Sequence, residues 1–428
     1  MIRGNFIGEL NEEMDGKRVV LAGWVHELRE TANVTFLLLR DSTGVVQVTG
    51  KKGVVSDETI RSMSLPKESV IKVTGIVKKS KEAKKGFEII PSEIVNLNPL
   101  RTKIPFEVTG KVPADLDVRL NYRYIDLRRQ ESRAVFNIQS TVLNTFTEFF
   151  SSRGFRNIRT PSIIAEASEG GAELFKVKYF EKDAYLAQSP QLYKQLAIIG
   201  GLDKVFMIVP VFRAEKSNTV YHLTESTQMD IEMGFAEADD VIELLIGVVR
   251  EIIKRVKERN SEDLATLKTT LEVPEPKVVT YKQVVEDMAK NGYKMEYGDD
   301  ISREIESGIE KVYGDMVVVK EFPAKLRAFY SMPKEGTDLT NSFDMIYKGL
   351  EISSGAQRIH DPDMLIEALK RKGLDPKGFE FYINAFRCGA PPHAGWSIGL
   401  ERLTMRISGV KNIRESSMFP RDRDRVTP

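Results

Sequence analysis

Apolar and polar residues alternate most clearly in the stretch 211–235, VFRAEKSNTVYHLTESTQMDIEMGF, which predicts two antiparallel strands joined by a long polar loop. The predicted strands carry Arg213, Glu215, Asp230 and Glu232. A single charged residue on a strand most often marks the solvent-facing side of a sheet. Four of them around one flexible loop indicate a functional site.

Short strand patterns also fill the first hundred residues. They are RVVLAGWV, VTFLLLRD, VVQV, VIKVTGIV and FEII followed by IVNL. About five strands in such a span predict a small closed barrel of the OB type, a fold that binds oligonucleotides. Phe36 lies mid-strand, where an aromatic residue is usually core, yet Arg29, Gln47 and Glu88 on neighbouring strands or turns offer groups that could read a base stacked on it.

Changes in pattern divide the chain into three parts. Residues 1–101 form the barrel domain, residues 102–130 form a hinge, and residues 131–428 form a second domain; three prolines fall in the stretch 98–117 around the boundary. A long amphipathic helix is predicted from Glu131 to Arg153, followed by an edge strand that carries Pro161. Residues 239–330 are interpreted as an insertion that covers part of the core.

The middle of the chain holds a loop and a short helix. The glycine-bearing loop 165–175 begins near Glu169 and is either a connector or a mobile lid. Ser189 and Pro190 are suited to starting the next helix, which carries Lys194 off its apolar stripe. A lysine there is normally a solvated surface charge.

Residues for phosphate chemistry lie in the second half of the chain. Asp344 and Glu351 fall on alternating strands, and a glycine-rich strand leads to a helix with Arg402 in its first turn. With Arg213 neutralising charge on an α-phosphate, and with Glu351 and Ser354 holding a metal, these residues could bind a nucleoside triphosphate with Mg²⁺. The sequence lacks both GxxxxGK[ST] and a GxGxxG after a strand, so the phosphate site must be of another kind.

Composition narrows the picture further. A chain of 428 residues with 41% hydrophobic and 29% charged residues predicts two or three globular domains. The net charge of +1 means that any contact with nucleic acid must come from local patches. One cysteine and four scattered histidines make a structural zinc site improbable, and the absence of a long apolar run predicts a cytoplasmic protein without a membrane span.

Three segments, in this order, resemble the signature motifs of the class II aminoacyl-tRNA synthetases. GFRNIRTPSII resembles motif 1, FRAE with QMDIEMGF resembles motif 2, and GWSIGLERL resembles motif 3. SPQLYK, EISSGAQRIH, FRCGAPPHAG and FPRDRDRVTP resemble the archaeal-type aspartyl enzymes of subclass b. The resemblance covers essentially the whole chain and implies an α+β fold, with an N-terminal OB-fold barrel followed by an antiparallel catalytic sheet flanked by helices. Trp396, the motif 2 loop and RIHDPD depart from the usual pattern.

The resemblance also implies a role for individual residues. It implies catalytic roles for Arg213 and Arg402, and magnesium binding by Glu351 and Ser354. The residues implied to bind ATP are Arg213, Glu215, His222, Phe235, Glu351 and Arg402, with Phe235 and Arg402 sandwiching the adenine. Those implied to bind aspartate are Glu169, Ser189, Gln191, Lys194, Arg213, Asp230 and Arg358, and those implied to bind the anticodon are Arg29, Phe36, Gln47 and Glu88. It implies no role for Glu232.

The resemblance implies an aspartate-tRNA ligase that uses L-aspartate, ATP and tRNA(Asp), and that forms a homodimer through motif 1. Asparaginyl-tRNA synthetase is an alternative. Lys194 disfavours it, because a neutral amide substrate would leave the Lys194 ammonium group unpaired. A tRNA-independent paralogue is disfavoured by the barrel with Phe36, and an inactive RNA-binding protein by the retained Arg213, Glu215, Glu351 and Arg402. His26 and the turn 83–86 slightly favour relaxed specificity that includes tRNA(Asn).

Overall fold

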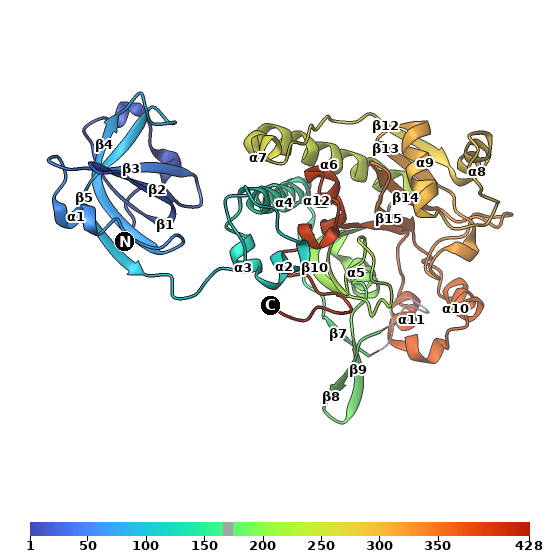
Figure 1. The fold of residues 1–428 in the computed structure, drawn as a ribbon. Helices are drawn as coiled ribbons and strands as arrows, with labels where there is room; N and C mark the ends of the chain where they lie inside the picture. Colours follow the sequence, from blue (N-terminus) through green and yellow to red (C-terminus); the bar gives the residue numbers. More distant parts are fainter. Residues whose placement is uncertain (166–173) are drawn as a thin grey trace. The chain divides into compact units, whose positions relative to one another are not determined.

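The computed structural model describes residues 1–165 and 174–428, so the predicted site residue Glu169 lies outside the described part. The chain divides into two compact units, Met1–Pro113 and Ala114–Pro428 (Figure 1). The two units are described separately below.

Unit 1 is a closed five-stranded barrel with the strand order β1-β2-β3-β5-β4. Its strands are β1 (Arg18–Glu30), β2 (Val34–Arg40), β3 (Val45–Lys51), β4 (Val70–Lys79) and β5 (Phe87–Asn98), and one short helix, α1 (Asp57–Arg61), follows β3. Alternate side chains such as Leu37 and Leu39 fill the interior. The predicted OB-type barrel is therefore confirmed.

Unit 2 is built on an eight-stranded sheet with the order β12-β13-β14-β15-β16-β11-β10-β6. The strands are β6 (Arg156–Asn157), β10 (Lys204–Phe212), β11 (Glu225–Gly234), β12 (Pro276–Thr280), β13 (Met316–Lys320), β14 (Ser342–Tyr347), β15 (Glu351–Gln357) and β16 (His393–Gly399). The six strands from β13 to β10 are antiparallel, and the outermost strands β12 and β6 pair in parallel. Strand β6 lies at the sheet edge, but it ends before Pro161, so the single edge strand expected to carry this proline is wrong.

Helices cover one face of this sheet. Every second side chain along a strand points to this face, and these side chains are apolar. Helices α4 (Gln130–Ser151), α6 (Ala238–Arg259) and α12 (Leu400–Ser408) pack side by side against it (Figure 1). Their buried side chains form one cluster with Met229 and Ile231 of β11 and with Trp396 and Ile398 of β16. The indole Nε1 of Trp396 donates a hydrogen bond of 2.8 Å to the Val241 carbonyl oxygen, which fixes α6 on the sheet.

In the part of the chain that the structure describes, helices cover the opposite face at its two ends. At one end, α8 (Tyr281–Lys290) and α9 (Arg303–Tyr313) pack on β13; at the other, α5 (Gln191–Ala197) and the turn 198–202 pack on β10. Helices α10 (Pro362–Arg371) and α11 (Glu380–Arg387) form a separate cluster that includes Leu192 of α5. The middle strands of this face are left for polar side chains.

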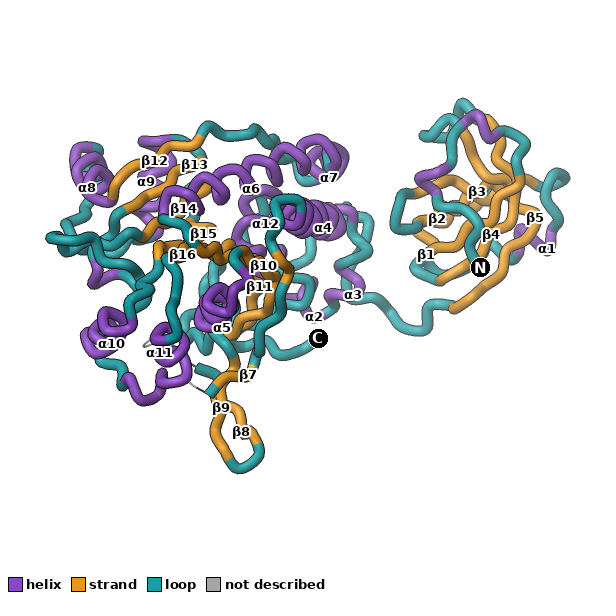
Figure 2. Tube along the Cα trace, turned by 180° about the vertical axis from the view of Figure 1, so that it is seen from behind, coloured by secondary structure: helices purple, strands orange, loops and turns teal. Residues whose placement is uncertain are grey.

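The remaining elements lie around this frame. Strands β7 (Ile163–Ile164), β9 (Lys182–Leu186) and β8 (Lys176–Tyr179) form a small sheet, and the β8–β9 hairpin projects from unit 2 in both views (Figures 1 and 2). Helices α2 (Leu116–Asn121), α3 (Arg123–Asp126) and α7 (Ser261–Thr266) complete the unit. Among the described helices, none is both long and apolar enough to cross a bilayer.

Three details differ from the sequence-based expectations. The segment 114–130 belongs to unit 2 rather than to a hinge, because the buried Arg123 donates hydrogen bonds to the carbonyl oxygens of Glu415, Ser417 and Met418. The region 239–330 is part of the main fold, because α6 lies in the core and β12 and β13 extend the sheet. Arg213 and Glu215 lie beyond the end of β10 rather than on it.

Candidate active site

A row of polar residues crosses the uncovered face of the sheet. Asp344, Ser354, Ser397 and Asp230 are register partners on the adjacent strands β14, β15, β16 and β11. Since side chains alternate along a strand, these four point away from the helix-covered core. The apolar partners Val319 and Met207 end the row on either side, so the sheet confines the polar region to its middle strands.

Lys194 is the most enclosed cation of this region, with a side chain only 1% exposed. Its Nζ lies 2.7 Å from Asp230 Oδ1 and 3.4 Å from Glu232 Oε2, and it donates to the carbonyl oxygens of Ile231 and Trp396. From the sequence, a lysine off the apolar stripe is usually a solvated surface charge. The structure shows a fixed, desolvated ammonium group.

Glu232 joins Lys194 to Arg358. Its Oε1 accepts from Arg358 Nε at 2.9 Å, and its Oε2 accepts from Arg358 Nη2 at 3.2 Å. Burial alone would raise the pKa of Glu232, but the charges of Arg358 and Lys194 outweigh it and lower the pKa. Glu232 is therefore ionised, and it is the organising residue that sequence reasoning missed. Its alternation with Asp230 on one face of β11 was the available signal.

Gly395 makes room for this carboxylate. A Cβ added at Gly395 would collide with the Glu232 carboxylate and with the Ile231 carbonyl oxygen. At this position the space is taken by the protein's own glutamate.

A neutral hydrogen-bond network supports the charge cluster. His393 Nδ1 lies 2.8 Å from the Pro391 carbonyl oxygen, which can only accept, so Nδ1 carries the proton and Nε2 accepts from Gln195 Nε2 at 2.8 Å. The Gln195 Oε1 atom then accepts from Tyr382 and from Gln191. Burial lowers the pKa of His393, which agrees with a neutral ring. These residues restrict the rotamers of α5, which carries Lys194.

Acidic and basic groups also alternate at the β14–β15 side of the row. Arg327 makes a bidentate pair with Asp344 at 2.7 and 2.8 Å and donates to Ser354 Oγ at 2.8 Å. Burial, with the negative charge of Asp344, raises the pKa of Glu351, and Arg402 and Arg327 oppose this shift. Arg402 Nη1 donates to the Glu351 backbone carbonyl oxygen at 3.1 Å.

The oxygen atoms at this side suit a hard cation such as Mg²⁺. Glu351 and Ser354 present a carboxylate and a hydroxyl, and the raised pKa of Glu351 shows an electrostatic strain that a cation would relieve. No cluster of three or more His, Cys, Asp or Glu side chains that could hold a metal occurs in the described ranges.

The loop 213–224 contributes the third part of the site. Its base is closed by a hydrogen bond from the Arg213 backbone nitrogen to the Thr224 carbonyl oxygen at 2.9 Å. His222 Nδ1 lies 2.6 Å from Thr219 Oγ1. Burial and the charges of Arg402 and Arg213 lower the pKa of His222, although Glu215 acts in the opposite direction. The predicted residues Arg213, Glu215, His222 and Arg402 are therefore electrostatic neighbours.

The C-terminal residues hold this loop from outside. Arg414 donates to the Thr219 carbonyl oxygen at 3.0 Å, and Asn218 donates to Asp424 at 2.6 Å. Arg423 donates to the Lys216 carbonyl oxygen at 3.1 Å. The conformation of the loop thus depends on residues two hundred positions away along the chain.

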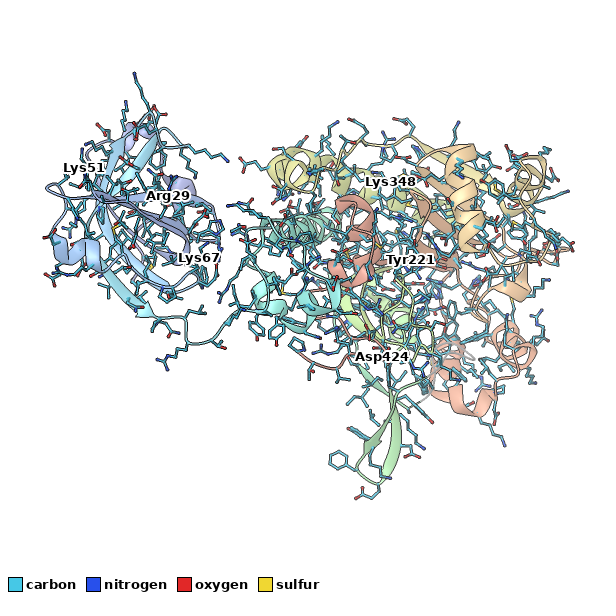
Figure 3. The ribbon with its side chains drawn as sticks, in the orientation of Figure 1. Arg29, Lys51, Lys67, Tyr221, Lys348 and Asp424 are labelled. Carbon is cyan, nitrogen blue, oxygen red and sulfur yellow. The ribbon has the colours of Figure 1, made fainter. Side chains whose placement is uncertain are left out.

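The barrel brings its four predicted residues together. Arg29 and Phe36 are register partners on β1 and β2, and Phe36 is half-buried. Gln47 Nε2 donates to Glu88 Oε2 at 2.9 Å. Figure 3 shows Arg29 on the same unit as Lys51 and Lys67, which supply further positive charge.

A family model described as "tRNA synthetases class II (D, K and N)" matches residues 115–423, and one described as "OB-fold nucleic acid binding domain" matches residues 19–97. The chain belongs to the class II tRNA synthetases. The family and the two-domain fold inferred from the sequence motifs are confirmed.

Relatives of this synthetase share its full length. It is 44% identical to an "Aspartate--tRNA(Asp/Asn) ligase" of Archaeoglobus fulgidus over 99% of each chain. It is 45% identical to an "Aspartate--tRNA(Asp) ligase" of Pyrococcus horikoshii over 100% of each chain.

Solved structures agree in fold. The asparaginyl-tRNA synthetase of Pyrococcus horikoshii with asparaginyl-adenylate superposes with a TM-score of 0.95 at 32% identity, covering 100% of both chains. The aspartyl-tRNA synthetase of Entamoeba histolytica gives 0.88 at 33% identity, covering 100% of this chain and 93% of that one. The fold therefore does not distinguish an aspartate from an asparagine substrate.

Phe235 is a correction to the expected site of the synthetase. Gln228 pairs with Gly399, immediately before the helix of Arg402, whereas Phe235 follows the other end of β11, where Gly234 pairs with His393. Six strand positions correspond to about 20 Å. Phe235 is 75% exposed and its backbone nitrogen donates to the Pro392 carbonyl oxygen, so it cannot sandwich a ring against Arg402.

Glu401, which precedes Arg402 in the synthetase, makes the stability of the fold depend on pH. Burial raises its pKa to about 7, although the Thr227 backbone nitrogen donates to both carboxylate oxygens, at 3.1 and 3.0 Å. The folded state therefore binds the proton more tightly than the unfolded state does. Its contribution to stability is full below pH 4.5 and is lost as the pH rises to about 7.

Glu401→Gln removes this titration. We expect the free energy of unfolding of Glu401→Gln, measured relative to that of wild type, to be about 3 kcal/mol higher at pH 8 than at pH 5. Urea unfolding at the two pH values measures the difference, and the exposed Glu243→Gln substitution is the matched control. A constant difference between Glu401→Gln and wild type at both pH values would contradict the raised pKa.

Proposed function

We propose that this synthetase is an aspartate-tRNA ligase. The observation that carries the proposal is the buried pair of cations, Lys194 and Arg358, held together by one carboxylate, Glu232. Glu232 binds Arg358 through Nε and Nη2, so Nη1 on the other side of the guanidinium group can donate to a substrate carboxylate. A neutral amide would gain less from two fixed cations.

Residues beside Lys194 can bind the ammonium group of the amino acid. Ser189 and Gln191 lie at the start of α5, beside Lys194, and their polar atoms can accept from the substrate ammonium group. Asp230 holds Lys194 and so acts as a positioning residue. Glu169, outside the described residues, belongs to the same part of the proposal.

ATP binds in this proposal across the Arg213, Glu215, His222 and Arg402 group. Arg213 stabilises charge on the α-phosphate, Glu215 accepts from the adenine amino group, His222 contacts the γ-phosphate and Arg402 lies against the adenine. A Mg²⁺ ion held by Glu351 and Ser354 supplies positive charge to the phosphates when bound.

The first step joins the aspartate α-carboxylate oxygen to the α-phosphorus of ATP while the bond from that phosphorus to the bridging oxygen breaks. Pyrophosphate leaves with the bonding electron pair. The nucleophile is already ionised, so this step needs no general base. In the second step, a hydroxyl oxygen at the 3′ end of tRNA bonds to the activated carbonyl carbon, its proton is released, and AMP leaves.

Amino-acid-dependent exchange of pyrophosphate into ATP tests the substrate. We expect aspartate to support exchange with kcat/KM at least about 100-fold above that of asparagine, because only aspartate brings a negative side-chain charge to Arg358 and Lys194. Lys182→Gln, an exposed change in β9, is the matched control and should retain this preference. Preference for asparagine would contradict the proposal and favour an asparaginyl enzyme.

We also propose that the barrel accepts both tRNA(Asp) and tRNA(Asn). The support is His26, whose Nδ1 accepts from Arg40 Nη1 at 2.7 Å while Arg40 pairs with Glu68. Burial and Arg40 lower the pKa of His26, so the ring is neutral and its Nε2 is a donor. A hydrogen-bond donor at Nε2 of His26 can serve the anticodon base of either tRNA.

Charging of each purified tRNA with labelled aspartate tests this relaxed specificity. We expect kcat/KM values for tRNA(Asp) and tRNA(Asn) within about tenfold of each other. A loss of more than about 100-fold on tRNA(Asn), about 2.7 kcal/mol, would show a discriminating enzyme instead.

A two-fold dimer is part of the proposal. Strand β6 leaves one edge of the main sheet unpaired in the described residues, and α4 runs beside it. A second copy could cover both elements. Sedimentation equilibrium at micromolar concentration should give twice the chain mass, and a monomer mass would contradict it.

A further inference from the structure

A cavity of 730 Å³ lies beside the proposed ATP site, between α9, α12, the turn that joins β14 to β15, and the loop 213–224. Tyr221 and Lys348, labelled in Figure 3, both line it. Its charged lining residues are Arg303, Lys348, Arg406 and Lys411 against Glu304 and Glu310, a net charge of +2. In a chain of net charge +1, this is a local concentration of positive charge.

Helix α12 connects the cavity to Arg402. Arg402 and Arg406 are four residues apart, so they lie one turn apart on the same face of the helix. Arg402 donates to the Glu351 carbonyl oxygen at 3.1 Å, and Arg406 donates to the Gly349 carbonyl oxygen at 3.3 Å. The cavity therefore lies one helical turn along α12 from Arg402, a residue of the proposed ATP site.

Arg303 connects the cavity to the loop. Its guanidinium carbon lies 4.2 Å from the centroid of the Tyr221 ring, next to His222. Burial lowers the pKa of Arg303, and the charges of Arg406 and Arg402 add to this lowering, while Tyr221 opposes it. Arg303 also forms an ion pair with Glu306, three residues later on the same helix. Like charges held this close favour a multivalent anion.

We propose that this cavity binds the inorganic pyrophosphate that leaves ATP in the first step. The inference rests on the proposed function, which supplies that product. Pyrophosphate carries several negative charges in a small volume and needs no apolar surface. The Tyr221 ring is covered by Arg303, so this aromatic surface is not open for stacking a base. The four cations would draw the leaving group away from the α-phosphorus along α12.

The double substitution Arg303→Gln with Lys348→Gln tests the site, because both charges line the cavity and neither belongs to the proposed catalytic residues. In aspartate-dependent exchange, we expect the KM for pyrophosphate to rise about tenfold, since each exposed charge contact contributes modestly. The KM for aspartate should stay within twofold of wild type. Lys311→Gln, an exposed change on α9 outside the cavity, is the matched control.

Three outcomes separate the possibilities. An unchanged KM for pyrophosphate in an active double variant would overturn the cavity assignment while leaving the ligase proposal intact. A raised KM for tRNA in charging, with pyrophosphate unaffected, would also overturn it and assign the cavity to the RNA backbone. Absence of aspartate-dependent exchange in the wild-type protein would instead refute the proposed function. Isothermal titration with inorganic pyrophosphate gives a second readout, in which the double variant should bind about tenfold more weakly than the Lys311→Gln control.

Discussion

The site depends on one buried carboxylate that holds two cations. Glu232 is fully buried, contacts Arg358 through both oxygens and lies 3.4 Å from the Lys194 ammonium nitrogen. A buried charge without partners costs several kcal/mol, so each member of this group requires the others. Asp230 completes the group through its contact with Lys194. The substrate carboxylate would therefore meet cations that are already fixed and already desolvated.

The sheet explains how such a group can exist beside a hydrophobic core. Alternation along β11 sends Met229 and Ile231 toward the helices and Asp230 and Glu232 toward the opposite face. The same alternation in the neighbouring strands makes a continuous polar row that ends in apolar packing at both sides. Specificity in this account comes from side chains on rigid strands, whereas the ATP groups lie partly on a loop that the C-terminal residues hold in place.

Sequence alone gave the family, the barrel and most of the polar residues, because the motifs are local and the strand alternation is regular. It could not give Glu232 its role, since Arg358 reaches this residue from just beyond the end of β15, 126 positions later in the chain. Phe235 was misplaced for a related reason: its position in the motif did not reveal which end of β11 faces Arg402. The hinge was extended too far because the contacts of Arg123 are with the C-terminal residues.

The most direct test of the central claim is the KM for aspartate of Glu232→Gln in pyrophosphate exchange. The account predicts a rise of at least about tenfold, because the amide cannot hold both cations, with the KM for ATP within twofold of wild type. Glu243→Gln is the matched exposed control, and Glu232→Asp, which keeps the charge, should recover part of the loss. A Glu232→Gln protein that folds and binds aspartate as tightly as wild type would contradict the account.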